Sequence, residues 1–132
     1  AMVLVHDGVR PFADEALIGK CLDGAVRHGA CIPGLPITDT IKQVDGLGRV
    51  ETTLDRDVLY RIQTPQAFRS DILSEAFRHA EQTGFTGTDD ASLVEHCGQP
   101  VFICTGSKFN IKLTTPDDLV IGEQILRQRD NC

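Results

Sequence analysis

The chain has 132 residues, of which 41% are hydrophobic and 5% aromatic, so it is long enough to bury the core of one domain. Its formal net charge of −6 argues against a nucleic-acid-binding surface, which needs a basic face. Its apolar runs are far shorter than the roughly 18 residues of a membrane span, and no signal peptide is indicated, so we expect a cytoplasmic protein.

The first predicted element is a strand at residues 2–5, where four apolar residues in a row indicate burial on both faces. The run stops before Asp7, and Pro11 rules out continued strand pairing. A buried strand therefore leads into a short polar loop before a helix, which is where open α/β sheets bind their ligands. Asp7 and Arg10 are the candidate ligand-facing residues of this loop; alternatively, they pair only with each other and fix the turn.

A helix is predicted from about Asp14, with Gly29 placed to end it. A short apolar strand follows at residues 30–35, and we expect Pro33 to break it. The apolar face of the helix consists of Leu17, Ile18, Cys21, Leu22 and Ala25.

Residues 36–56 are predicted to form a projecting β-hairpin. Two segments of alternating side chains flank an Asp-Gly-Leu-Gly sequence at residues 45–48, and Asp-Gly is a strong hairpin signal. The hairpin has too few large apolar residues to belong to the core. We therefore expect an arm that extends from the body and is covered by a partner chain.

The second half of the chain alternates short strands and helices. A strand at residues 59–64 precedes a helix that Ser70 caps and Gly84 ends. A shorter helix begins after Thr88, and another strand is predicted at residues 101–105. The buried stripe of the helix after Ser70 is predicted to consist of Ile72, Leu73, Ala76, Phe77 and Ala80.

The last predicted elements are an extended piece at residues 110–113 and a helix that runs to about Arg127. That helix has a strong start, because Thr115 can cap it and Pro116 suits its first position. The alternation of strands and helices along the chain predicts an α/β fold with a mostly parallel sheet.

The cysteines are scattered singly and form no C-x-x-C pair. This spacing predicts reduced, partly buried thiols in a cytoplasmic protein and argues against a zinc site. The five are Cys21, Cys31, Cys97, Cys104 and Cys132.

No Gly-rich phosphate loop and no Walker A sequence is present. The candidate functional residues are therefore the hydroxyls and cations that lie near the ends of the predicted strands and helices. Such residues, without an obvious base or nucleophile, suit phosphate binding, where the protein positions and neutralises charge. Simpler interpretations exist: Arg56 lies between two aspartates and could form a surface ion pair, and Thr88 could be only a helix cap. Lys112 lies in an apolar run and must either extend to solvent or face a ligand. The candidates are Asp7, Arg10, Thr40, Arg56, Thr64, Thr88 and Lys112.

Six stretches, in order across nearly the whole chain, resemble the 2-C-methyl-D-erythritol 4-phosphate cytidylyltransferases of the non-mevalonate isoprenoid pathway. The resemblance implies a partial Rossmann-like nucleotidyltransferase fold with a projecting hairpin. It also implies an enzyme that uses Mg²⁺ to join CTP to methylerythritol phosphate and releases pyrophosphate. The stretches lie at residues 5–12, 39–42, 53–56, 63–68, 88–93 and 110–119.

The resemblance assigns roles on the sugar-phosphate side of the reaction. Arg56 and Lys112 match the basic pair that positions the substrate phosphate for attack on the α-phosphorus of CTP. Hydroxyls that match the lining of the same substrate's site are Thr40, Thr64 and Thr88.

On the nucleotide side, Asp7 and Arg10 match the loop beneath CTP and its metal, with Asp7 as the metal-binding residue. The hairpin at residues 36–56 matches an arm that interlocks two subunits of a homodimer. Cations in such a site reduce the repulsion between a dianionic nucleophile and a polyanion.

The chain departs from the family in two places. Gly8-Val9 stands where the family often has two alanines, and Val9 is also similar to the related ribitol-5-phosphate cytidylyltransferases. The family's N-terminal portion, with the Gly-rich CTP loop, is not in the chain. We therefore expect residues 1–132 to be the C-terminal portion of a single cytidylyltransferase domain, inactive alone.

Other functions stay open at this point. The first alternative is cytidylyl transfer to ribitol 5-phosphate, and the second is a non-catalytic fragment that binds sugar phosphates or only dimerises. An oxidoreductase is the weakest alternative, because no dinucleotide fingerprint follows any strand.

Overall fold

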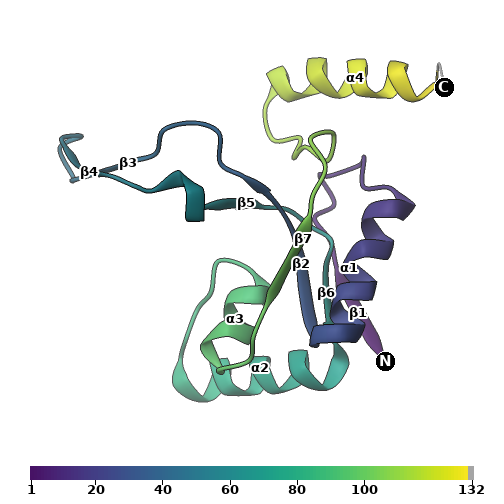
Figure 1. The fold of residues 1–132 in the computed structure, drawn as a ribbon, viewed down its shortest axis with the longest axis vertical. Coiled ribbons are helices and arrows are strands. Elements are labelled where there is room, and N and C mark those ends of the chain that lie inside the picture. The colour runs from purple at the N-terminus through teal and green to yellow at the C-terminus, as the bar shows by residue number, and fades with distance from the viewer. Residues whose placement is uncertain (131–132) are drawn as a thin grey trace.

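Strand β2 is the centre of the fold, because other strands pair along both of its edges (Figure 1). In the computed structural model, which describes residues 1–130, β7 pairs with one edge in parallel, and β5 and β6 pair antiparallel with the two halves of the other edge. β1 completes the sheet by pairing antiparallel with β6. The strands are β1 (Met2–Val5), β2 (Ala30–Pro36), β3 (Lys42–Val44), β4 (Val50–Thr53), β5 (Tyr60–Ile62), β6 (Gln66–Arg69) and β7 (Phe102–Thr105).

The sheet is mixed in direction. β1, β2 and β7 run the same way, as expected of a mostly parallel sheet, whereas β5 and β6 run the opposite way, with β6 between β1 and β2. The α/β fold with a partial Rossmann-like sheet is thus confirmed. The reversed strand β6 was not indicated by the sequence, since its four residues directly follow Pro65 and directly precede a helix.

Pro33 lies inside β2 and does not break it, so that prediction is wrong. Its carbonyl accepts a hydrogen bond from the backbone N–H of Gln63 at 2.9 Å, so Pro33 faces the edge along which β5 and β6 pair. The partner strand is itself interrupted there, at residues 63–65. Proline is tolerated at such an irregularity because no ladder donor is required of it.

Helices cover both faces of the sheet. Alternate residues of β2 point to opposite faces: Cys31 packs in a cluster with α1, whereas Ala30 and Ile32 pack with α2 and α3. The buried face of α1 was predicted correctly at Leu17, Cys21 and Ala25. The helices are α1 (Glu15–His28), α2 (Ser70–Thr83), α3 (Asp90–His96) and α4 (Pro116–Asp130).

Two predictions about α2 are wrong. Arg69, with extended backbone, occupies the N-cap position, and no side chain caps the helix. Ser70 is already helical, and its N–H donates to the carbonyl of Ala1 at 2.9 Å, so β6 continues into α2 without a linker. Phe77, predicted to be buried, is 49% exposed because it lies beside a surface cavity rather than against the sheet.

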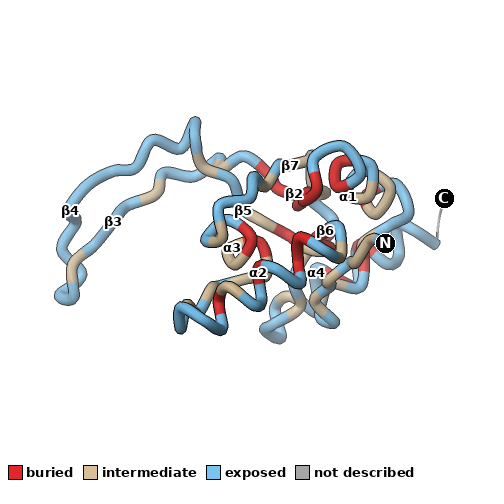
Figure 2. Tube along the Cα trace, turned by 90° about the horizontal axis from the view of Figure 1, so that it is seen from below, coloured by how far each residue is buried: buried red, intermediate tan, exposed pale blue. Residues whose placement is uncertain are grey.

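The hairpin of β3 and β4 projects from the body, as predicted (Figures 1 and 2). Its turn is closed by a hydrogen bond from Gly48 N to Asp45 O at 3.1 Å, with Gly48 in a left-handed conformation at φ +82°. Every residue of both strands is exposed. We call residues 36–56 the hairpin arm.

Three thiols meet beneath α1. Cys21 Sγ lies 3.5 Å from Cys104 Sγ, and Cys31 is buried beside them. Burial raises the pKa of Cys31 to about 12 and also raises that of Cys21, so both thiols are protonated at neutral pH. These three and Cys97 are free, and Cys132 lies outside the described residues. None of the helices within residues 1–130 has the length and apolar character needed to cross a membrane.

Candidate active site

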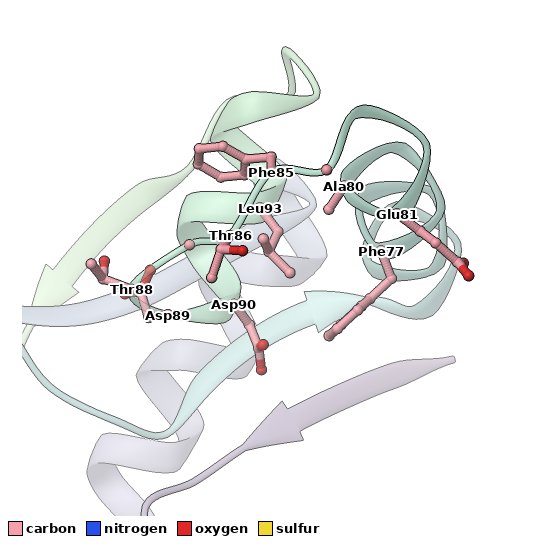
Figure 3. Close-up of a pocket in the computed structure, with 11 residues that line it drawn as sticks. Phe77, Ala80, Glu81, Phe85, Thr86, Thr88, Asp89, Asp90 and Leu93 are labelled. Carbon is pink, nitrogen blue, oxygen red and sulfur yellow. The ribbon is translucent and has the colours of Figure 1, made fainter.

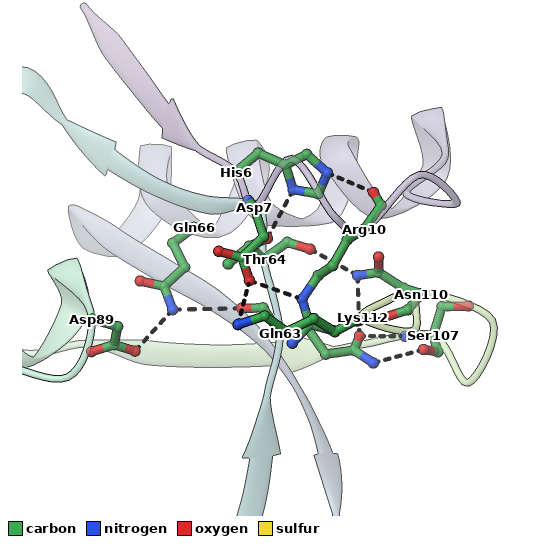
Figure 4. A network of polar contacts seen from close by, with 10 residues as sticks. All are labelled: His6, Asp7, Arg10, Gln63, Thr64, Gln66, Asp89, Ser107, Asn110 and Lys112. Atoms are coloured by element: carbon green, nitrogen blue, oxygen red, sulfur yellow. Dashed lines mark hydrogen bonds and ion pairs between the residues drawn. The ribbon is translucent and has the colours of Figure 1, made fainter. Parts of the chain in front are cut away.

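Thr64 lies in the interruption between β5 and β6, and its hydroxyl connects that point to the loop after β1 (Figure 4). The backbone N–H of Asp7 donates to Thr64 Oγ1 at 3.0 Å, and Thr64 Oγ1 lies 2.8 Å from His6 Nδ1. His6 Nε2 lies 2.9 Å from the carbonyl of Arg10, which can only accept, so Nε2 carries the proton. In a neutral imidazole, Nδ1 then accepts the hydroxyl hydrogen of Thr64. Thr64 therefore positions the loop, with its own donor directed at His6.

One carboxylate lies between two cations at this loop. Arg10 Nε donates to Asp7 Oδ2 at 3.2 Å, and Lys112 Nζ lies 3.6 Å from the same oxygen. Asp7 and Arg10 therefore do pair, but not only with each other, because Lys112 joins the same carboxylate. The cluster has a net positive charge, and this suits a phosphate ligand.

Asn110 joins the loop after β7 to the same cluster. Its Nδ2 donates to the carbonyl of Thr64 at 2.7 Å, and its own carbonyl accepts from Arg10 Nη1 at 2.8 Å. Asn110 is fully buried, and it stands two residues before Lys112. It therefore fixes the segment that carries the lysine. We call the group the sheet-break cluster; its members are His6, Asp7, Arg10, Thr64, Asn110 and Lys112.

The buried polar residues of the described chain gather at the same interruption. They are Gln63, Gln66 and Asn110, and all three are amides. Gln66 Nε2 donates to Asp89 Oδ2 at 3.0 Å, and Gln66 Oε1 accepts from Ala91 N at 3.2 Å, so the start of α3 is held beside the interruption. The resemblance assigns no role to these amides, although all three lie within the matching stretches at residues 63–68 and 110–119.

Thr88 lies next to this region but lines a separate cavity of about 700 Å³ between α2 and the loop before α3 (Figure 3). The cap of α3 is formed by Asp89, whose Oδ1 accepts from Ser92 N at 2.8 Å, and not by Thr88. Burial, and next the neighbouring Asp89 carboxylate, raise the pKa of Asp90 in the same cavity. Thr88 itself is exposed, so its hydroxyl is open to a ligand.

Thr40 and Arg56 lie at the base of the hairpin arm. Arg56 begins the 3₁₀ turn η1 (Arg56–Val58), and its Nη1 donates to the carbonyl of Thr38 at 2.8 Å. Within residues 1–130, no hydrogen bond or ion pair joins Thr40 or Arg56 to the sheet-break cluster, and Arg56 forms no ion pair with the aspartates beside it. The structure thus brings together one group of predicted residues, namely Asp7, Arg10, Thr64 and Lys112.

Asp7 is the candidate metal ligand, and its other oxygen, Oδ1, has no partner among residues 1–130. The described chain contains no group of three or more His, Cys, Asp or Glu residues arranged to hold a metal ion. Mg²⁺ is often bound by only one or two carboxylates together with substrate phosphates. Asp7 therefore fits a Mg²⁺ ion that is held mainly by the phosphate oxygens of a ligand.

Comparisons with known proteins agree over almost the whole chain. A family model described as IspD, 2-C-methyl-D-erythritol 4-phosphate cytidylyltransferase, matches residues 1–128. The protein of that name from Geobacillus thermodenitrificans (strain NG80-2) is 52% identical over 128 residues, which are 97% of this chain and 56% of the relative. The one from Syntrophus aciditrophicus (strain SB) is 47% identical over 129 residues, which are 98% of this chain and 55% of the relative.

The same name recurs among solved structures. The crystal structure of 2-C-methyl-D-erythritol 4-phosphate cytidylyltransferase from Thermus thermophilus matches with a TM-score of 0.87 at 38% identity, covering 96% of this chain and 62% of that one. The chain spans about half the length of the curated relatives it matches.

Proposed function

The chain belongs to the 2-C-methyl-D-erythritol 4-phosphate cytidylyltransferase family, and on this premise we propose that it contributes to the joining of CTP and 2-C-methyl-D-erythritol 4-phosphate. The products are CDP-methylerythritol and pyrophosphate, and the reaction serves isoprenoid biosynthesis in the cytoplasm. The observation that carries the proposal is the sheet-break cluster, where Arg10 and Lys112 share one carboxylate and leave a net positive charge.

In the proposed reaction, a phosphate oxygen of methylerythritol phosphate attacks the α-phosphorus of CTP. A new P–O bond forms there, the bond from the α-phosphorus to the bridging oxygen breaks, and pyrophosphate leaves with the electron pair. Lys112 and Arg56 hold the attacking phosphate in line, and Arg10 supports the loop beneath the nucleotide. Their charges offset the repulsion between the two anions, which is the main task of a protein in phosphoryl-type transfer.

Asp7 and the threonine hydroxyls have supporting roles in this proposal. Asp7 would bind Mg²⁺ through Oδ1, and the bound ion would neutralise charge on the triphosphate. Thr40 and Thr88 donate hydrogen bonds to methylerythritol phosphate. Thr64 lies at the same site but acts mainly by fixing Asp7, because its hydroxyl hydrogen is directed at His6.

We further propose that the hairpin arm joins two subunits and that Thr40 and Arg56 act in the partner's site. Every residue of both strands of the arm is exposed, and several of its apolar side chains face solvent, among them Val44 and Val50 at 52% and 53% exposure and Leu47 at 93%. Covering them with a second copy would remove apolar surface from water. It would also give Arg56 the phosphate-binding role that it lacks within one chain.

The chain alone is proposed to be inactive. The resemblance places the Gly-rich CTP loop and its basic residues in a portion of the family that precedes the stretches matched here. The residues of the sheet-break cluster can hold the attacking phosphate, but the CTP triphosphate would have few partners. Losing a single transition-state donor commonly costs ~10²–10³ in rate, and several losses compound.

The test measures pyrophosphate release from CTP and methylerythritol phosphate, first with this chain and then with a protein of the relatives' length that contains it. We expect turnover only from the longer protein, with higher kcat/KM for methylerythritol phosphate than for ribitol 5-phosphate. Comparable kcat/KM values for the two substrates would support the ribitol alternative. No turnover with either substrate would leave the non-catalytic alternative, and equal turnover from both proteins would contradict the inactivity of the chain.

A further inference from the structure

A recess of about 310 Å³ lies beside the sheet-break cluster and is lined by cations from three segments of the chain. The cations are Arg10, Arg61, Lys108 and Lys112, and within residues 1–130 no Asp or Glu lines the recess. The protein as a whole has a formal net charge of −6, so this concentration of positive charge is a local property. It marks the recess as a place where an anion is stabilised.

Arg61 and Lys108 are the cations whose charge is not already used. Arg10 and Lys112 share the Asp7 carboxylate, whereas neither Arg61 nor Lys108 makes an ion pair or a side-chain hydrogen bond within the described chain. Both are exposed, so a solvated surface position is the simplest account of each one separately. The two nevertheless face one recess, and the segments that carry them are tied together.

The backbone that carries Lys108 is tied to the end of β5 by the side chain of Gln63 (Figure 4). Gln63 Nε2 donates to the carbonyl of Ser107 at 2.8 Å, and Gln63 Oε1 accepts from Ser107 N at 3.1 Å. A Cβ atom at Gly106 would lie 2.5 Å from Gln63 Oε1, so a larger residue there would displace the Gln63 amide from Ser107. Lys108 is therefore presented by a fixed loop, and the residue that fixes this loop follows closely after Arg61.

Asn110, which also lines the recess, is held in one orientation. Its Nδ2 is used by Thr64 O and Gln63 Oε1, both of which are acceptors, so the amide orientation is determined. Its Oδ1 is buried and has no hydrogen-bond partner within the described chain.

We propose that this recess is a second anion subsite, centred on Arg61 and Lys108, that binds the phosphate group of a phosphomonoester or a diphosphate. The resemblance assigns neither residue a role, and the inference goes beyond the proposed function because it does not require cytidylyl transfer. A phosphate here would receive hydrogen bonds from Arg61 and Lys108. Its position next to Lys112 makes both the sugar phosphate and released pyrophosphate suitable sources.

The test titrates the 132-residue chain with inorganic phosphate and with pyrophosphate in a calorimeter. Arg61→Gln and Lys108→Gln remove one charge each from the recess, and Lys20→Gln is the matched control, because Lys20 is an exposed lysine on α1 outside the recess. Each recess variant should bind at least about tenfold more weakly, since a hydrogen bond from a charged donor is worth about 1.5–3 kcal/mol. The control should stay within about twofold, and Lys108→Arg should retain binding.

The same variants identify the source of the phosphate. Titration with methylerythritol phosphate, pyrophosphate and CTP shows which affinity falls in Arg61→Gln and Lys108→Gln. Equal affinity for inorganic phosphate and pyrophosphate in the parent and both variants would overturn the subsite. The subsite would also be overturned if the parent chain bound no anion but self-associated, and if this self-association weakened in Arg61→Gln. The recess would then be a contact between copies of the chain. Loss of turnover in the longer protein with anion binding intact would instead contradict only the proposed function.

Discussion

The sheet-break cluster and the hairpin arm both carry predicted site residues, but they are held in different ways. In the cluster, Thr64 and Asn110 link three segments that are far apart in the sequence. In the arm, the contacts are local, such as Lys42 Nζ to Thr53 Oγ1 at 2.6 Å across the hairpin. The chain therefore fixes the cluster by contacts between distant segments, whereas within residues 1–130 the hydrogen bonds of the arm's two strands lie within the arm.

The largest expected effect comes from testing whether the arm and the cluster that form one active site belong to different subunits. In a protein of the relatives' length, Arg56→Ala in the arm and Lys112→Ala in the cluster should each lower kcat by ~10²–10³, because each removes a cation from the attacking phosphate. If the arm acts in the partner's site, a mixed dimer with one variant in each chain regains one intact site. About half of randomly paired dimers are mixed, so roughly a quarter of the parent turnover should return.

The measurement is pyrophosphate release before and after the two variants are mixed and allowed to re-pair. The control mixes each variant with itself, which restores nothing. If the mixture is no more active than the separate variants, Arg56 acts within its own chain and the contrast between the regions is lost.

A smaller effect concerns stability. Asn110→Ala should lower the free energy of unfolding by about 2 kcal/mol, because it removes the side-chain donor to the carbonyl of Thr64 and one of the two donors to Gln63 Oε1. Thr40→Ala is the matched change in the arm and should stay within about 0.5 kcal/mol of the parent. Urea unfolding of both variants checks this. A large loss for Thr40→Ala would mean that the arm packs against its own body.

The smallest effect is a pH dependence at one carboxylate in the arm and one in the body of the chain. Asp45 in the arm accepts from Arg49 N and Leu47 N, and Asp118 at the start of α4 accepts from Thr114 N and Thr115 N. These hydrogen bonds lower the pKa of both carboxyl groups. Because the folded-state pKa values are depressed, the stabilisation is present above the ordinary value of about 4 and is lost as the pH falls through the depressed values.

Amide chemical shifts in an acid titration measure this loss at each place. The Leu47 amide shift should follow the titration of Asp45, and the Thr115 amide shift should follow that of Asp118. In Asp45→Asn, the Leu47 amide should stop titrating while the Thr115 amide is unchanged, and Asp118→Asn should do the reverse. A coupled response would show that the arm and the body communicate within one chain.

The sequence predicted the parts of the site that depend on local order. An apolar strand that stops before Asp7 placed Asp7 and Arg10 at the sheet edge, and Lys112 stood out in an apolar run. The expected burial of that strand on both faces is wrong, because β1 is an edge strand without a buried residue and Leu4 is 40% exposed. Asp-Gly likewise predicted the turn of the hairpin arm, and the structure confirms it. In each case the physical cause lies within a few residues, so the spacing of side chains was enough.

The remaining features depend on contacts between distant residues. Thr64 reaches Asp7 only because β6 runs in reverse between β1 and β2, and Asn110 has its partner 46 residues earlier. Pro33 is accommodated in β2 because the neighbouring strand is interrupted beside it. Which strand lies opposite a residue is decided by packing of the whole sheet, and no local pattern carries that information.

The interruption between β5 and β6 also limits how this segment can change in length. Cys31 of β2 pairs with Ala67, and Gly34, three residues further on, pairs with Ile62, five residues back. The partner strand therefore holds two extra residues, an even number, so the side chains on both halves keep the same faces. Insertions or deletions of two residues would preserve this arrangement, whereas a change of one would turn every residue of β5 to the opposite face. Length variation at residues 63–65 is thus confined to even steps, although the segment has no regular secondary structure.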